Sequence, residues 1–107
     1  MSLHCRIDGR KMTARIVGEV DHHHAKQLML ELERKLEIYY PRELTLDLSG
    51  VTFMDSSGIA VLLRACRQIR EMDGQLQAVG VPEQAARVLR TAGMQKMMRI
   101  EYLGEEA

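Results

Sequence analysis

Aromatic side chains are scarce in this chain, which has no Trp, one Phe and three Tyr among 107 residues. A core without large rings must be built from Leu, Ile, Val, Ala and Met, and apolar residues make up 46% of the sequence. The eight Met residues suit irregular gaps in such a core or an adaptable contact surface, and those inside apolar helical segments favour the core. The length predicts one compact domain, residues 1–107, without room for a second.

An excess of charge of either sign is also lacking, because 15 Lys and Arg balance 15 Asp and Glu. This balance excludes the basic surface of a nucleic-acid-binding protein and a polybasic membrane anchor. No stretch approaches the ~20 apolar residues that cross a bilayer, and the charged first ten residues do not resemble a signal peptide. Cys5 and Cys66 are isolated thiols without metal-ligand spacing, as in proteins of a reducing compartment. We therefore expect a soluble, cytoplasmic protein.

Apolar residues alternate between the period of a strand and the period of a helix. Two alternating segments, 5–7 and 12–17, flank the turn signal Asp8-Gly9 and predict a hairpin. Helices are then expected to begin near Asp21, Ser56 and Pro82, with strands at 44–48 and 76–81 and a short strand or extended tail at 97–100. This order predicts an α/β fold: a small mixed β-sheet with an N-terminal hairpin and helices packed against it.

Some local features can be assigned to single residues. Asp21 is placed as the N-cap of the first helix, Pro41 ends that helix, and Ser49-Gly50 is expected to be a loop. The residues expected on buried helix faces are Leu28, Met29, Leu32 and Leu36 in the first helix, Ile59, Leu62, Leu63, Cys66 and Ile69 in the second, and Ala85, Val88, Leu89 and Ala92 in the third.

The segment from Phe53 to Ile59 is the most informative part of the sequence, because an apolar run leads through Asp55-Ser56-Ser57-Gly58 directly into a helix. Asp and Ser at such a junction are ordinary helix caps, and this structural role is sufficient to account for them. The same position also suits a modified serine. A helix N-terminus tolerates an added phosphate, which brings about −1.5 to −2 charges without disrupting the helix.

Several segments of the chain together resemble the STAS family and, within it, the bacterial anti-sigma factor antagonists. The matching segments are Gly18-Glu19-Val20-Asp21-His22-His23, Leu44-Thr45-Leu46-Asp47-Leu48, Phe53-Met54-Asp55-Ser56-Ser57-Gly58 with its spacing to Gly74, and Arg90-Thr91-Ala92-Gly93-Met94 before Arg99-Ile100. The resemblance covers almost the whole chain. The Asp-Ser-Ser-Gly motif in register with the upstream Gly-Glu-Val-Asp segment is its most specific part.

The resemblance implies a regulatory mechanism. The unphosphorylated antagonist binds a partner that is both anti-sigma factor and serine kinase, and the sigma factor is released, as in sporulation or stress responses. The kinase then phosphorylates the first Ser of the motif, here Ser56, and a PP2C-type phosphatase removes the phosphate. The protein would be a substrate and a ligand, with no catalytic activity and no cofactor, and we expect it to be a monomer.

The same resemblance, with the expected helix surface, suggests a contact surface around Ser56. The residues assigned to it are Asp21, Asp55, Ser57, Gly58, Ile59, Arg64 and Arg67. Asp21 and Asp55 would both cap helices and contribute to the partner contact. Arg64 and Arg67 lie on the outer side of the second helix, where a purely solvated face is an equally good interpretation. Ala60 departs from the sporulation member of the family, which has a second Gly there, so the cognate kinase stays open.

The sequence also allows three other interpretations. A constitutive STAS scaffold or sensor module, used in a signalling or transport complex without phosphorylation, is the main alternative. A hydrolase is disfavoured because the Gly-x-Ser-x-Gly elbow is absent around Ser56. A metal site at His22, His23 and His24 is disfavoured because successive helical residues point about 100° apart and cannot converge on one ion.

Overall fold

Alternation of apolar and polar residues gives the central sheet one buried face and one polar face. On strand β3 (Glu43–Met54), the side chains of Leu44, Leu46 and Leu48 are buried, whereas Thr45 and Asp47 point to the other side. The neighbouring strands repeat this pattern, so one apolar layer runs across the sheet and needs a cover of helices.

The computed structural model describes residues 1–104. Its elements in chain order are β1 (Ser2–Asp8), β2 (Lys11–Val20), α1 (Ala25–Tyr39), β3 (Glu43–Met54), α2 (Ser56–Glu71), β4 (Gln75–Val81), α3 (Glu83–Thr91), the 3-10 helix η1 (Met94–Lys96) and β5 (Arg99–Tyr102). The strand order is β1-β2-β3-β4-β5, with β1 antiparallel to β2 and the later neighbours parallel. The predicted α/β fold with an N-terminal hairpin and a mixed sheet is confirmed.

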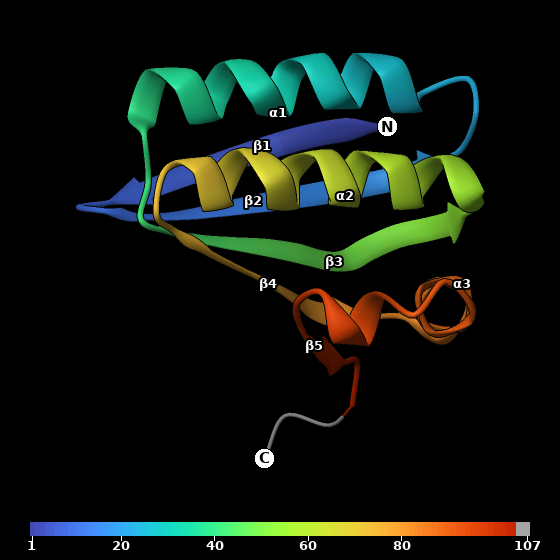
Figure 1. Cartoon of the computed structure of the whole chain (residues 1–107). Coiled ribbons are helices and arrows are strands. Elements are labelled where there is room, and N and C mark those ends of the chain that lie inside the picture. Colours follow the sequence, from blue (N-terminus) through green and yellow to red (C-terminus); the bar gives the residue numbers. More distant parts are fainter. Residues whose placement is uncertain (105–107) are drawn as a thin grey trace.

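Helices α1 and α2 lie side by side over one face of the sheet (Figure 1). Each connects two adjacent parallel strands, and right-handed crossovers in the same direction place both helices on the same face. Leu28, Leu32 and Leu36 of α1 and Leu62 and Ile69 of α2 are almost completely buried there. Helix α3 packs near the end of β3, beside α2.

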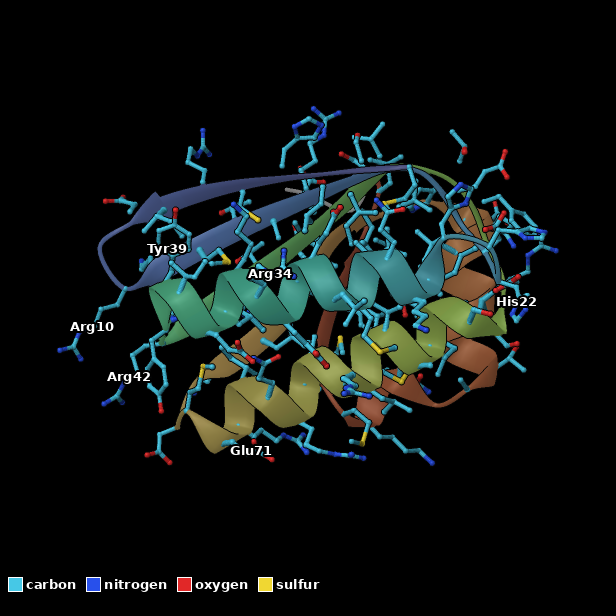
Figure 2. The ribbon with its side chains drawn as sticks, turned by 90° about the horizontal axis from the view of Figure 1, so that it is seen from above. Arg10, His22, Arg34, Tyr39, Arg42 and Glu71 are labelled. Atoms are coloured by element: carbon cyan, nitrogen blue, oxygen red, sulfur yellow. The ribbon has the colours of Figure 1, made fainter. Side chains whose placement is uncertain are left out.

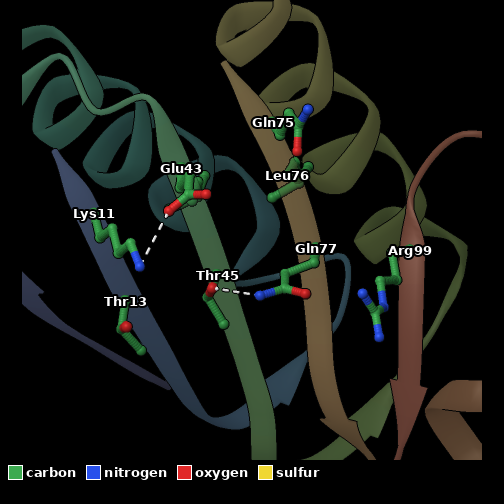
Figure 3. Close-up of a pocket in the computed structure, with 9 residues that line it drawn as sticks. Lys11, Thr13, Glu43, Thr45, Gln75, Leu76, Gln77 and Arg99 are labelled. Atoms are coloured by element: carbon green, nitrogen blue, oxygen red, sulfur yellow. Dashed lines mark hydrogen bonds and ion pairs between the residues drawn. The ribbon is translucent and has the colours of Figure 1, made fainter.

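The opposite face of the sheet is polar and carries a shallow hollow near the amino ends of the parallel strands (Figure 3). The side chains of Lys11 and Glu43 approach to 3.6 Å across it, and Gln77 donates a hydrogen bond of 3.0 Å to Thr45. This hollow lies at the end of the sheet away from Ser56, so we do not include it in the candidate site.

Several predicted strand boundaries were wrong, and β2 continues beyond the predicted end at Val17 to Val20. Ser49-Gly50 is not a loop, because β3 continues through it to Met54. The pairing with β2 is irregular here: Arg15 pairs with position 47 and Val17 with position 50, so β3 contains one extra residue, as in a β-bulge. The last strand begins at Arg99 and not at Met97, because η1 occupies the preceding residues.

Some predicted core positions were also wrong. Leu63 is 38% exposed and Ala92 is exposed, whereas Val61 and Ala86, which the pattern did not assign, are buried. The buried faces of α2 and α3 differ from the prediction because the two helices pack against each other as well as against the sheet. Within residues 1–104, no helix combines the length and the apolarity that a membrane span requires.

Candidate functional site

The candidate site forms where two parallel strands end next to each other. Val20, the last residue of β2, is the register partner of Met54, the last residue of β3, and the Asp55 N–H donates to the Val20 carbonyl at 3.2 Å. The loops that lead into α1 and α2 therefore start side by side. His22 lies at this end of the molecule, opposite to the end that carries Arg10 (Figure 2).

Asp55 fixes the start of α2 and joins the two loops. Its Oδ1 accepts the Ser57 N–H at 2.8 Å, which makes Asp55 the N-cap of α2, and its Oδ2 accepts the His22 N–H at 3.1 Å. The predicted capping role of Asp55 is confirmed. The second hydrogen bond could not be expected from the sequence, because it spans 33 residues.

Asp21 does not cap α1, contrary to the prediction. Its Oδ1 accepts the N–H groups of His23 and His24 at 3.1 Å each and contacts the His24 Nδ1 at 2.7 Å. These bonds close a turn that precedes the helix, and α1 begins only at Ala25, with His24 as its N-cap. The Asp21 carboxylate thus stabilises the loop beside Asp55, in the turn that precedes α1.

The hydrogen bonds around Asp21 alter the pKa of its carboxyl group. Partial burial acts to raise this pKa, but hydrogen bonds from the ring and the backbone N–H of His24 outweigh it, and the pKa falls below its ordinary value of 3.8. A lowered folded-state pKa means that ionised Asp21 stabilises the fold above about pH 4. This stabilisation is lost as the pH falls through the folded-state pKa.

We therefore expect Asp21→Asn to lower the free energy of unfolding at pH 7, and the difference from the wild type to shrink below about pH 4. Urea unfolding at pH 7, 5 and 3 measures this difference. Asp8→Asn serves as a control, because Asp8 is an exposed carboxylate in the β1–β2 hairpin. If Asp21→Asn lowered the free energy of unfolding by the same amount at all three pH values, the lowered pKa of Asp21 would be contradicted.

Ser56 is the first residue of α2 and is exposed, whereas the neighbouring Ser57 is partly buried. Asp55, and not Ser56, supplies the side chain that caps the helix. A chemical change at the Ser56 hydroxyl therefore leaves the cap in place. The exposed position that a phosphorylation site requires is present here.

Gly58 has a packing role inside the first turn of α2. It is buried, and a Cβ at this position would lie 2.6 Å from the Cγ of Met54, whose side chain is itself 1% exposed. A larger residue would push the helix start away from the end of β3. We therefore treat Gly58 as a positioning residue, because it offers no side chain to a partner.

Gln84 of α3 is an important residue of the site that the sequence reasoning missed. Its Oε1 accepts the N–H of Met54 at 2.8 Å, and its Nε2 donates to the carbonyl of Met54 at 2.8 Å. Strand β4 pairs with β3 only as far as Asp47. Beyond that point, the side chain of Gln84 replaces a neighbouring strand as the hydrogen-bond partner of the β3 backbone at Met54, just before Asp55. No local signal identifies this role, because it depends on a residue 30 positions away.

The outer face of α2 extends the site beyond its first turn. Arg67 is exposed, and Arg64 is exposed but forms an ion pair with Glu33 of α1. Leu63, four residues before Arg67, is its neighbour on this face and is 38% exposed. The two arginines are therefore not equivalent: Arg67 faces solvent, whereas Arg64 is partly engaged by the neighbouring helix.

A hollow of about 520 Å³ lies between α2 and α3 and includes Ser56 in its wall. Ile59, predicted as both a core and a contact residue, is half-buried in this wall. Close to the motif, Phe53 is 43% exposed. In the described part of the chain, no three side chains of His, Cys, Asp or Glu converge as a metal site would require.

The sequence profile of the STAS domain matches residues 4–107, and the chain belongs to this family. A similar curated protein is the anti-sigma F factor antagonist of Paenibacillus polymyxa, 28% identical over 89 residues, which are 83% of this chain and 76% of the relative. The resemblance inferred from the Asp-Ser-Ser-Gly motif is thereby confirmed.

Solved structures show the same fold. The anti-sigma factor antagonist SpoIIAA in its unphosphorylated form superimposes with a TM-score of 0.80 and 19% identity, over 92% of this chain and 87% of that chain. The Bacillus cell fate determinant SpoIIAA in its phosphorylated form gives a TM-score of 0.71 at 19% identity, over 92% and 90% of the two chains. At this level of identity, the structures establish the architecture.

Proposed function

We propose that this protein is an anti-sigma factor antagonist controlled by phosphorylation of Ser56. In the unphosphorylated state it binds an anti-sigma factor that is also a serine kinase, and the sigma factor is released. Curated relatives and structural neighbours named as anti-sigma factor antagonists support this proposal. We expect the protein to act in the cytoplasm as a monomer and as a substrate of its partner, without catalytic activity.

The observation that carries the proposal is the division of roles between Asp55 and Ser56. Asp55 caps α2 and holds the adjoining loop, so the exposed Ser56 hydroxyl has no structural task that a phosphate would disturb. Modification can therefore change the charge of the surface by nearly two units while the helix start stays folded. This is the behaviour required of a reversible binding switch.

The proposed reaction is a phosphoryl transfer from ATP bound to the kinase. The Ser56 Oγ forms a bond to the γ-phosphorus, the bond from that phosphorus to the leaving oxygen of ADP breaks, and the hydroxyl proton passes to a base on the kinase. A PP2C-type phosphatase would return Ser56 to the free hydroxyl by hydrolysis. We assign Asp21, Asp55, Ser57, Ile59 and the arginines 64 and 67 to the partner contact.

Phosphate transfer tests the proposal directly. Incubation with the anti-sigma factor kinase and ATP should add one phosphate to the wild type and none to Ser56→Ala. Ser57→Ala is the matched control and should accept one phosphate at Ser56. Mass spectrometry of proteolytic fragments locates the phosphate. Phosphate at another residue, or undiminished uptake by Ser56→Ala, would overturn the assignment.

A further inference from the structure

The hollow between α2 and α3 places Ser56 opposite residues of another helix. Ser56 and Ile59 line it from α2, and Gln84, Arg87 and Val88 line it from α3. Its volume of about 520 Å³ greatly exceeds the ~10–15 Å³ that a cavity needs to hold one water molecule. A phosphoryl group on Ser56 therefore has room to turn into the hollow and approach α3.

Among the described residues that line this hollow, Arg87 alone carries a charge. The ion pairs found in residues 1–104 are Lys11–Glu43, Asp21–His24 and Glu33–Arg64, so Arg87 is not engaged in one. Arg90 of α3 lies over the ring of Tyr102, and the other titratable side chains near the starts of α2 and α3 are the carboxylates Asp21, Asp55 and Glu83 and the histidines 22–24. A guanidinium remains charged at every relevant pH, which separates Arg87 from these groups.

We infer that Arg87 binds the phosphoryl group of phosphorylated Ser56. Two N–H groups of a guanidinium can donate to two phosphate oxygens at once, and this charge-assisted pair is stronger than a neutral hydrogen bond. The inference rests on the proposed function only in taking Ser56 as the phosphorylated residue. It adds a receptor for the phosphate within the same chain.

The pair has a consequence for the surface that a partner meets. It spans the hollow from α2 to α3 and covers the apolar side chains of Ile59 and Val88. The unphosphorylated protein presents an open hollow with a free guanidinium, and the phosphorylated protein presents a closed one. Phosphorylation then removes a binding feature in addition to introducing charge.

The second ionisation of the phosphate, which has a pKa of about 6, reports the proposed pair. Phosphoserine is installed at residue 56 by genetic encoding, so no kinase is needed, and its ³¹P NMR signal is followed between pH 4 and 8. The proteins compared are the otherwise wild-type chain, Arg87→Gln and Arg90→Gln. Arg90 is on the same helix but lies over the ring of Tyr102, outside the hollow.

A positive charge beside the phosphate favours its dianion and lowers this pKa. We expect Arg87→Gln to raise the midpoint by about half a pH unit relative to the unmutated phosphoprotein. Arg90→Gln should shift it much less. The backbone amides at the start of α2 are present in all three proteins, so the difference reports Arg87. Circular dichroism verifies that each variant is folded.

Equal midpoints for the unmutated phosphoprotein and Arg87→Gln, or equal shifts for both variants, would overturn the inference. Neither result depends on whether the kinase recognises Ser56, because the phosphoserine is encoded. Conversely, a protein that the kinase does not phosphorylate would refute the proposed function and leave the ³¹P result standing. The two failures are therefore distinguishable.

Discussion

Ser56→Asp is expected to weaken binding to the anti-sigma factor kinase by about 10-fold, and full phosphorylation of Ser56 by ~100-fold or more. A carboxylate at residue 56 must be partly desolvated in the interface, the phosphate adds more charge and also closes the hollow beside Arg87, and each ~1.4 kcal/mol changes an affinity tenfold. Ser56→Ala adds no charge and should bind within a few-fold of the wild type. Isothermal titration calorimetry with the purified kinase measures all three affinities.

A charge placed away from the site provides the control. Thr13 lies on the polar face of the sheet, near the amino ends of the strands, so Thr13→Asp adds the same charge at the far end of the molecule. It should leave the affinity unchanged. Equal affinities for Ser56→Asp and the wild type would favour the alternative of a constitutive STAS scaffold that does not use phosphorylation.

Gln84→Leu is expected to produce the largest loss of stability among substitutions near the site, about 2–4 kcal/mol of unfolding free energy. Leu preserves much of the volume but removes both hydrogen bonds to the backbone of Met54. Each backbone group left unsatisfied and away from water costs about 1–3 kcal/mol. Chemical denaturation followed by circular dichroism gives the difference.

Gln77→Leu is the matched control, because Gln77 donates one hydrogen bond to the side chain of Thr45 on the open face of the sheet. Water can replace that bond, so the loss should stay below about 1 kcal/mol. If the two variants lost the same stability, the bonds from Gln84 to Met54 would not be the support of the site that the geometry indicates.

The parts of the fold that depend on local chemistry could be predicted from the sequence. The Asp8-Gly9 turn between two alternating segments predicted the hairpin, and β1 and β2 pair directly around it. The apolar run that ends in Asp55 predicted the junction of a strand with a capped helix, which is present. The exposure of Ser56 follows from the same junction, because the first residue of a helix has fewer neighbours than those in later turns.

Features that depend on contacts between distant segments could not be predicted. Gln84 and Arg87 carry no local signal, and they reach the site only because α3 packs beside the end of β3 and the start of α2. Asp21 has the sequence of an N-cap, but its bonds to His23 and His24 complete a separate turn first. Leu63 fits the helical period, yet it is 38% exposed and lines a surface hollow with Arg67 and Met97.

The central claim is that phosphorylation of Ser56 decides whether the partner binds. The most direct test uses one preparation of wild-type protein phosphorylated at Ser56 and measures its affinity for the kinase before and after complete removal of the phosphate. We predict weak binding before dephosphorylation and a gain of ~100-fold or more after it. An affinity that is the same in both states would contradict the account.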